Sequence, residues 1–333
     1  MADETDVLRI GLIGLGAMGR HHARVIRSTP GLRLVAVADP IGDRFGVAGE
    51  LPVLPDVQAI IDAGVDGVMV AVPTSLHEEV ALTLAAAGVH AMVEKPIAHS
   101  VESGERVARA FEDAGLVGAV GYVERCNPAM IALRERIAKG VLGEVYQITT
   151  SRQGPFPERI NDVGVVQDLA THDVDLTPWI AGSAYTTVTA HVTYRSGRQH
   201  EDMLVASGRL ANGVIVNHLV NWLSPRKERH CVVTGEKGAL VADTLTGDLT
   251  YYENGTLENE WDAIASFRGV SEGDVTRFSL HKREPLAVEH QGFRDAIRGV
   301  ADPYIVPMRE GVETLRVVDA CLRSAREGVA VPL

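Results

Sequence analysis

The chain has 333 residues, 46% of them hydrophobic and 23% charged, so it is long enough for two domains with sizeable cores. Its formal net charge of −12 argues against nucleic acid or an anionic membrane as a general partner. The acidic first residues do not resemble a secretory signal, no apolar stretch is long enough to span a bilayer, and three distant cysteines predict neither a disulfide framework nor a zinc site. A reducing cytoplasm is therefore the expected location.

The first third of the chain alternates short apolar runs with helical patterns. The expected strands are residues 7–13, 34–38, 67–72, 90–93 and 117–121. The clearest helices between them are residues 77–87 and 101–114. This alternation predicts a doubly wound α/β domain over residues 1–122, with a parallel sheet and helices on both faces.

A glycine-rich turn, Gly14-Leu15-Gly16-Ala17-Met18-Gly19, joins the first expected strand to a helix that runs through Ile26. Gly14 permits the tight turn, Gly16 lets the backbone approach a pyrophosphate, and Gly19 lets the helix pack closely on the strand. The N–H groups at the start of the helix then face the phosphates. The alternative is a glycine-rich turn without a ligand, but the strand–turn–helix context and a later acid favour a dinucleotide.

That acid is Asp39, at the end of the second expected strand, and it predicts which dinucleotide binds. A carboxylate here accepts hydrogen bonds from a ribose 2′-hydroxyl and repels a 2′-phosphate. No cation follows directly, and the nearest one, Arg44, is expected over the adenine or in solvent. We therefore predict NAD rather than NADP.

The pattern changes after about residue 122. A helix over residues 128–139 precedes strand-like runs at residues 144–152, 187–194, 203–210, 214–223, 229–234 and 239–242. Short turns such as Ala211-Asn212-Gly213 predict a largely antiparallel sheet, so residues 123–333 are expected to form a second domain for substrate binding and oligomerisation. Helices over 288–298 and 311–327 close the chain and can pack back on the first domain, whereas the polar stretch 266–284 is expected to be a loop.

Glu94-Lys95-Pro96 follows an expected strand of the first domain. Ligands of open α/β sheets bind beyond the carboxyl ends of the strands, which places Lys95 at the active edge. The alternative is a surface lysine before a turn, although the following proline fixes the backbone.

A second candidate segment lies in an expected helix through Ile180. Asp168 and His172 are four residues apart and therefore project from one face, which Asp175 shares. Carboxylates fix the tautomer of a histidine and raise its basicity, which suits removal of a hydroxyl proton during hydride transfer. A helix with surface salt bridges explains the spacing equally well. The spacing could also hold a metal, but no third His or Cys ligand lies nearby, so no metal is expected.

Together these motifs resemble the Gfo/Idh/MocA oxidoreductases. The matching segments are GLGAMGRHHAR (14–24), VPTSLHEEVA (72–81), EKPIA (94–98) and DLATHDVD (168–175), in family order over nearly the whole chain. The resemblance implies a Rossmann domain, an open-faced antiparallel sheet, catalytic Lys95, Asp168 and His172, and a cis peptide between Lys95 and Pro96. The implied NAD contacts are Gly14, Gly16, Ala17, Met18, Gly19, Asp39, Arg44, Val72, Pro73, Thr74, His77, Glu94 and Lys95.

Segments 121–129 and 152–165 are similar to the UDP-N-acetylglucosamine 3-dehydrogenase branch of this family, although Cys126 and Asn161 depart from its usual residues. Arginine binds phosphate oxygens bidentately, so Arg125, Arg152 and Arg159 suit the diphosphate of a nucleotide-linked sugar. Surface pairing with Glu124, Glu158 and Asp162 is the alternative. The implied substrate contacts are Lys95, Tyr122, Arg125, Asn127, Arg152, Arg159, Asp162, Asp168 and His172.

The expected function is an NAD-dependent dehydrogenase acting at C3 of a nucleotide-activated hexose such as UDP-GlcNAc. The alternatives are an inositol or free-sugar dehydrogenase, an NDP-ketosugar reductase, or an NAD-binding sugar-sensing regulator without turnover. The presence of Lys95, Asp168 and His172 together argues against the regulator. Alternating apolar residues over 214–223 suit burial of a sheet face against a partner, which predicts a homodimer or homotetramer.

Overall fold

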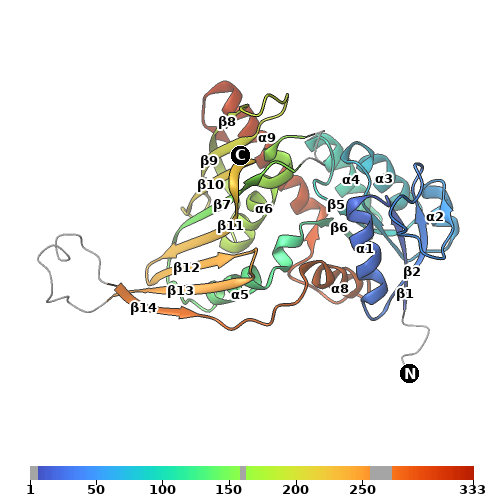
Figure 1. Ribbon diagram of the computed structural model, residues 1–333, viewed down its shortest axis with the longest axis horizontal. Coiled ribbons are helices and arrows are strands. Elements are labelled where there is room, and N and C mark those ends of the chain that lie inside the picture. Colours follow the sequence, from blue (N-terminus) through green and yellow to red (C-terminus); the bar gives the residue numbers. More distant parts are fainter. Residues whose placement is uncertain (1–6, 158–162, 256–271) are drawn as a thin grey trace, which may run out of the picture. The chain divides into compact units, whose positions relative to one another are not determined.

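The computed structural model describes residues 7–157, 163–255 and 272–333, and over these the chain forms two compact units. One unit contains residues 1–126 and 283–316, and the other contains residues 127–282 and 317–333. The chain therefore enters the second unit after Cys126 and later returns to the first. Figure 1 labels most elements of both units.

The first unit is built on a sheet with the strand order β15-β6-β5-β4-β1-β2-β3. Its strands are β1 (Leu8–Ile13), β2 (Leu32–Ala38), β3 (Val53–Leu54), β4 (Gly67–Val70), β5 (His90–Glu94), β6 (Gly118–Gly121) and β15 (Val306–Pro307). β15 pairs antiparallel with β6, and the other neighbours pair parallel. The strand order reverses beside β1, because β2 lies on one side of it and β4 on the other. The predicted doubly wound sheet is confirmed.

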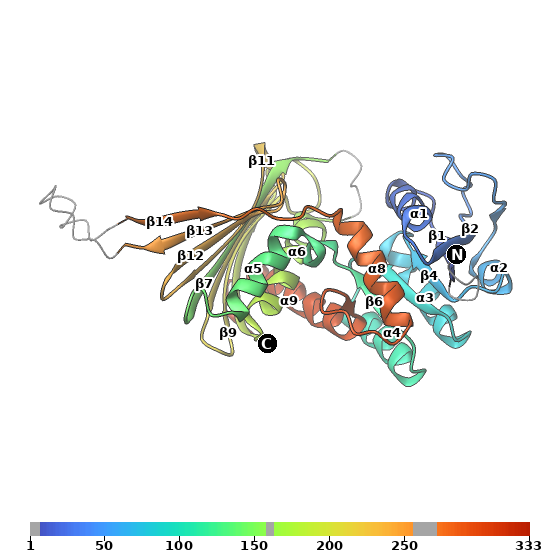
Figure 2. The same ribbon diagram turned by 90° about the horizontal axis from the view of Figure 1, so that it is seen from below.

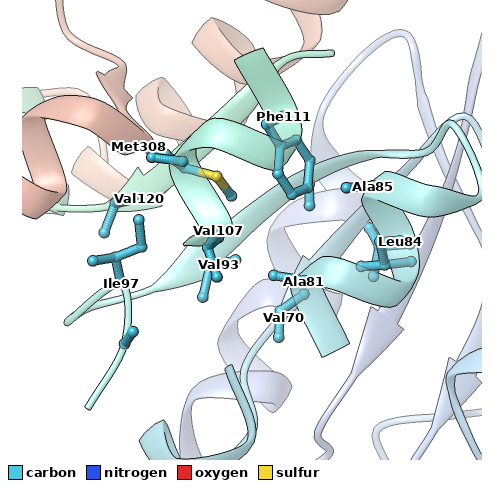
Figure 3. Packing of buried hydrophobic residues seen from close by; sticks show 14 of the residues in the cluster. Val70, Ala81, Leu84, Ala85, Val93, Ile97, Val107, Phe111, Val120 and Met308 are labelled. Atoms are coloured by element: carbon cyan, nitrogen blue, oxygen red, sulfur yellow. The ribbon is translucent and has the colours of Figure 1, made fainter. Parts of the chain in front are cut away.

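Helices cover both faces of this sheet. They are α1 (Ala17–Ser28), α2 (Val57–Asp62), α3 (His77–Ala86), α4 (Val101–Asp113) and α8 (Pro285–Ile297), with short 3₁₀ turns η2 (Thr74–Leu76) and η3 (Val123–Cys126). Adjacent strand residues point to opposite faces, so Val70 packs with Leu84 and Phe111 on one side (Figure 3), whereas Met69 packs with Phe293 on the other.

The second unit is built on a sheet with the order β14-β13-β12-β11-β7-β10-β9-β8-β16. Its strands are β7 (Val145–Pro155), β8 (Tyr185–Thr193), β9 (Met203–Leu210), β10 (Ile215–Asn221), β11 (Leu223–Gly235), β12 (Gly238–Asp243), β13 (Asp248–Asn254), β14 (Glu272–Arg277) and β16 (Val331–Pro332). β10 pairs parallel with β7, and the remaining pairs are antiparallel. Gly213, at φ +91°, closes the predicted β9–β10 hairpin. The largely antiparallel sheet is confirmed.

Two helices, α5 (Pro128–Ala138) and α6 (Thr171–Ala181), lie on one face of this sheet (Figure 2). Side chains toward them, such as Val216 and Val233, are fully buried. Their neighbours on the other face are more exposed, with Val205 at 45% and Tyr252 at 47%. α9 (Met308–Glu327) begins in the first unit and ends in the second.

The expected loop over 266–284 is wrong for residues 272–277, which form β14. This strand pairs with β13, but its side chains from Asp274 to Arg277 are mostly exposed, so it lacks the alternation of buried apolar residues that identifies a strand. Residues 266–271 lie outside the described part. The strands β3, β15 and β16 were also not predicted, because a strand of two residues has no periodic pattern of apolar residues.

Candidate active site

The glycine turn follows β1, at the point where the strand order of the first sheet reverses. Gly14 has φ +93°, and a Cβ there would lie 2.4 Å from the carbonyl oxygen of Ala71. A Cβ on Gly19 would lie 2.0 Å from the carbonyl oxygen of Gly14. Both positions therefore require glycine because the backbone itself occupies the space.

Gly16 differs from these two glycines. It is the N-cap residue of α1, and a Cβ built on it would meet no described atom within 4 Å. The open space lies at a helix start where the N–H groups of the first turn, including those of Ala17 and Met18, have no partner within the helix. This arrangement fits a pyrophosphate, because a helix N-terminus attracts anions and the absent side chain permits close approach.

Asp39, the residue expected to bind the ribose, lies just after β2 and is hydrogen-bonded to the glycine turn. Its Oδ2 accepts the backbone N–H of Leu15 at 2.8 Å, and its Oδ1 accepts that of Ile41 at 2.8 Å. Each oxygen keeps a further lone pair, so the half-buried carboxylate can still accept from ribose hydroxyls. Arg44 is exposed in the following loop. The Asp43 carboxylate accepts hydrogen bonds from three backbone N–H groups of this loop.

Of the expected NAD contacts, Val72, Pro73 and Thr74 follow β4 and lead into η2. His77, which begins α3, is 1% exposed, and its ring nitrogens lie 2.8 Å from the Pro96 carbonyl oxygen and 3.0 Å from that of Val72. Burial lowers the pKa of His77, so the ring is neutral and donates to one carbonyl at a time. His77 therefore joins the segments that follow β4 and β5.

Glu94 ends β5, and Lys95 follows at the carboxyl edge of the sheet. The peptide between Lys95 and Pro96 is cis, as the family resemblance implied. Glu94 Oε2 accepts the backbone N–H of Lys95 at 3.2 Å, and Glu94 Oε1 lies 2.8 Å from Nε2 of His22 on α1. Lys95 is half-buried.

Asp168 and His172 belong to the second unit. The expected α-helix around them is instead a turn of π-helix, η4 (Val166–Ala170), followed by α6, which begins at Thr171. The Thr171 N–H reaches back to the Val166 carbonyl, a wider step than in an α-helix. Asp168 is 6% exposed on η4, and His172 is half-buried on the first turn of α6. Turns of π-helix occur often at functional sites.

The start of η4 is held by a residue that sequence reasoning did not identify. Glu201 accepts the Val166 N–H through Oε1 at 3.1 Å, and its carbonyl accepts the Val165 N–H at 3.0 Å. Glu201 lies against Gly164, where a Cβ would meet its carboxylate at 1.9 Å. A carboxylate at this end also complements the helix dipole.

The candidate diphosphate arginines are paired differently from the surface alternative. Arg152 is 4% exposed and forms a bond of 3.0 Å from Nε to Oδ1 of Asp173 on α6, which is also buried. Arg125 is 3% exposed and reaches Glu310 Oε2 at 2.7 Å. Arg159 and Asp162 lie outside the described residues.

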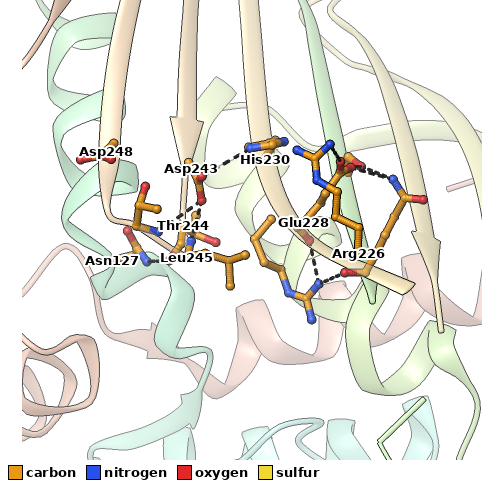
Figure 4. Close-up of polar contacts among 12 residues, drawn as sticks. Asn127, Arg226, Glu228, His230, Asp243, Thr244, Leu245 and Asp248 are labelled. Carbon is orange, nitrogen blue, oxygen red and sulfur yellow. Dashed lines mark hydrogen bonds and ion pairs between the residues drawn. The ribbon is translucent and has the colours of Figure 1, made fainter. Parts of the chain in front are cut away.

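The other expected substrate contacts take structural positions. Tyr122 is 1% exposed in the core of the first unit. Asn127 begins the second unit, where its Oδ1 accepts the Ala129 N–H at 3.0 Å and its Nδ2 donates to the Thr244 carbonyl at 3.0 Å (Figure 4). Asn127 thus caps α5 and fixes the turn after β12.

A buried polar chain lies on the sheet face under α6. His218 on β10 has Nδ1 2.7 Å from Thr150 Oγ1 and Nε2 2.8 Å from the Tyr185 hydroxyl. Burial lowers the pKa of His218 to about 4 and raises that of Tyr185, so both are neutral. Thr177 on α6 donates to the Asp173 carbonyl at 2.7 Å. The two contacts of His218 join residues 68 and 33 positions apart, so no local sequence motif predicts them.

Two other features are absent from the described residues. No group of three or more His, Cys, Asp and Glu in that part of the chain is arranged to hold a metal ion. Within the same ranges, no helix combines the length and hydropathy needed to cross a membrane.

Comparison with known proteins agrees with this geometry. Residues 8–122 match the family model of the NAD-binding Rossmann fold of the Gfo/Idh/MocA oxidoreductases, and residues 134–333 match that of their C-terminal alpha/beta domain. UDP-N-acetylglucosamine 3-dehydrogenase of Acidithiobacillus ferrooxidans is 30% identical over 95% of this chain and 96% of its own. Its solved structure has a TM-score of 0.82, at 25% identity over 96% and 98% of the two chains.

A second relative is scyllo-inositol 2-dehydrogenase (NAD(+)) of Bacillus subtilis, 26% identical over 98% of this chain and 96% of its own. The matched models together span most of the chain and include both units. The chain therefore belongs to the Gfo/Idh/MocA family of oxidoreductases, and its first unit is an NAD-binding Rossmann domain.

Proposed function

We propose that this dehydrogenase oxidises a secondary alcohol of a sugar, namely C3 of a nucleotide-activated hexose such as UDP-GlcNAc. The observation that carries the substrate class is the 30% identity, over 95% of the chain, to a UDP-N-acetylglucosamine 3-dehydrogenase. The fit of the Gly14–Gly19 turn and Asp39 to a dinucleotide supports NAD as the hydride acceptor.

In this proposal His172 removes the hydroxyl proton, and Lys95 donates a hydrogen bond to the oxygen as negative charge develops there. Asp168 orients His172 or the substrate. When bound, NAD supplies the nicotinamide that takes the hydride from the carbinol carbon. The alternative assignment exchanges the roles of Lys95 and His172.

Arg125, Arg152 and Arg159 are the proposed candidates for binding the diphosphate. Arg159 carries most of this proposal, because Arg125 and Arg152 already share their charge with Glu310 and Asp173. Arg159→Ala should therefore impair turnover of nucleotide sugars more than that of free sugars. Equal losses with both substrates would remove the diphosphate argument.

A screen of NADH formation tests the substrate class, with UDP-GlcNAc, myo-inositol, scyllo-inositol and glucose as substrates. We expect the highest kcat/KM with UDP-GlcNAc and a 3-keto product. Preference for an inositol would favour the second candidate, which the 26% identity to scyllo-inositol 2-dehydrogenase supports. NAD binding without turnover of any sugar, in either direction, would indicate a sensor.

We also propose that the protein forms a homodimer or homotetramer through the exposed face of the second sheet. Strand pairing places Val205 in register with Leu219, and Tyr252 with Val275, all on the face opposite α5 and α6. Val275 is 61% exposed, and these two pairs are apolar surface on that face that a second copy would cover. A monomeric mass by light scattering at micromolar concentration would contradict this.

A further inference from the structure

Two buried histidines stand behind Glu94 in the first unit. His22 on α1 places Nε2 2.8 Å from Glu94 Oε1 and Nδ1 2.9 Å from Nε2 of His290 on α8. His22 is 2% exposed and His290 0%. Since the other Glu94 oxygen accepts the backbone N–H of Lys95, a hydrogen-bonded chain connects α8, α1 and the segment that carries Lys95.

The chemistry of the groups fixes the direction of these hydrogen bonds. An ionised carboxylate only accepts, so His22 donates its Nε2–H to Glu94. Nδ1 of His22 then accepts, and His290 donates its Nε2–H to it. This leaves Nδ1 of His290 without a hydrogen, which agrees with its having no hydrogen-bond partner among the described residues.

The charges around the chain favour this arrangement. Burial alone would raise the pKa of Glu94, but the hydrogen bond from His22, aided by the positive charge of Lys95, brings that pKa below its usual value. Burial holds the pKa of His290 well below its usual value, so His290 stays neutral. Further titratable or charged groups on these elements are Arg20, His21, Arg24 and Arg27 on α1, Glu284 just before α8, Glu289, Arg294 and Asp295 on α8, and Glu124 and Arg125 on η3.

We propose that His22 and His290 are positioning residues for Lys95, which act by holding Glu94 in place as a carboxylate. The carboxylate fixes the Lys95 backbone and stabilises its ammonium, so that Lys95 acts as the cation and His172 takes the proton. The inference rests on the proposed catalytic role of Lys95, and it selects one of the two role assignments given above.

The test compares His22→Leu, His22→Gln, Glu94→Gln and the double variant His22→Leu/Glu94→Gln, assayed with NAD and UDP-GlcNAc or the best sugar of the screen. A glutamine at position 22 can still donate to Glu94 without titrating. His90, at the opposite end of β5, accepts the Val117 N–H at 3.0 Å, and His90→Gln is the matched control.

We expect His22→Leu to lower kcat about tenfold, because buried hydrogen-bonded groups couple by roughly this amount, with little change in NAD affinity. Without this donor Glu94 loses the hydrogen bond that offsets burial, so the pKa of Glu94 rises and the acid limb of the kcat profile moves to higher pH. His290→Leu should move the limb in the same direction but less. His22→Gln and His90→Gln should leave it in place, and Glu94→Gln should abolish the shift caused by His22→Leu.

Infrared spectra of the protein without substrate give a second readout. The carbonyl band of a protonated carboxyl should appear at higher pH in His22→Leu than in the unaltered protein, and should be absent when Glu94→Gln is added. Additive kcat losses in the double variant, or an unmoved band and acid limb, would overturn the inference. Unimpaired turnover in Lys95→Ala would instead overturn the proposed function, so the two failures are distinguishable.

Discussion

The glycine turn of the first unit and the η4–α6 segment of the second position their functional groups by opposite means. In the turn, the positions are set by what is absent, since side chains at Gly14 and Gly19 would collide with backbone and one at Gly16 would occupy open space. In η4–α6, the positions are set by buried polar side chains, chiefly Glu201 at the helix start and Arg152 against Asp173.

The two segments should therefore tolerate substitutions differently. A cofactor shared by many enzymes can be bound by backbone N–H groups, which any sequence with the right glycines supplies. A segment that carries substrate chemistry needs side chains, and these require partners when they are buried. We therefore expect changes in the turn to separate NAD affinity from stability, and changes around α6 to affect stability and turnover together.

The largest expected effect tests whether chemistry resides in the second unit. His172→Ala should lower kcat by about two to four powers of ten, the usual contribution of a positioned acid–base group. NAD affinity should be retained, because the glycine turn and Asp39 lie in the other unit. Steady-state kinetics and NAD titration measure both quantities, with exposed His191→Ala on β8 as the control. A kcat near normal would transfer the base role to Lys95.

The buried ion pair should dominate the stability of the second unit. Arg152→Met leaves the Asp173 carboxylate buried without this cation, which should cost about 3–5 kcal/mol in the free energy of unfolding. Denaturant unfolding measures the loss. Adding Asp173→Leu removes the stranded charge and should restore much of that stability, though not kcat. A small loss in the single variant would show that the pair is not what holds α6.

His218 makes the second unit sensitive to acid. Its pKa is about 4 when folded and about 6.5 when exposed, so between these values the unfolded chain binds a proton that the folded chain excludes. Stability from this group is complete above pH 6.5 and falls by roughly 3 kcal/mol as the pH drops to 4. His218→Gln should remove that slope, with His191→Gln as the exposed control. Unchanged slopes in both variants would contradict the assignment.

The smallest expected effects sharpen the contrast within the turn. Gly16→Ala should weaken NAD binding by about tenfold with an unchanged Tm, because its Cβ enters open space needed by the pyrophosphate. Gly19→Ala should instead cost about 1–3 kcal/mol of stability through the contact with the Gly14 carbonyl. Titration with NAD and thermal unfolding distinguish them. Equal losses of Tm in the two variants would mean that both glycines are needed for packing, which would contradict the contrast.

Sequence patterns predicted the first unit well because its information is local. The alternation of apolar runs with helices, the glycine spacing and Asp39 all lie within short windows. The same reasoning placed the main antiparallel strands, but β11 begins at Leu223 rather than near 229, since a register shift between Leu223 and Glu228 interrupts its alternation. Exposed β14 carried no periodic signal at all.

The candidate site was predictable only where motifs exist. Lys95, Asp168 and His172 belong to such motifs, and their catalytic roles stay predictions. The contacts around these residues belong to no local motif. His22 and His290 are 268 residues apart in the sequence, and Val166 and Glu201 are 35 apart. Sequence spacing also could not show that Arg152 forms a buried ion pair with Asp173 instead of lying at the surface.

The return of residues 283–316 to the first unit limits how the protein can be divided. Phe293 of α8 and Met308 and Val312 of α9 are part of that unit's core, and β15 completes the edge of its sheet beside β6. A fragment that stops at Cys126 would expose this apolar surface to water and should aggregate. A soluble NAD-binding fragment would need residues 283–316 rejoined by a linker, because the core of the first unit is complete only once these residues have been synthesised.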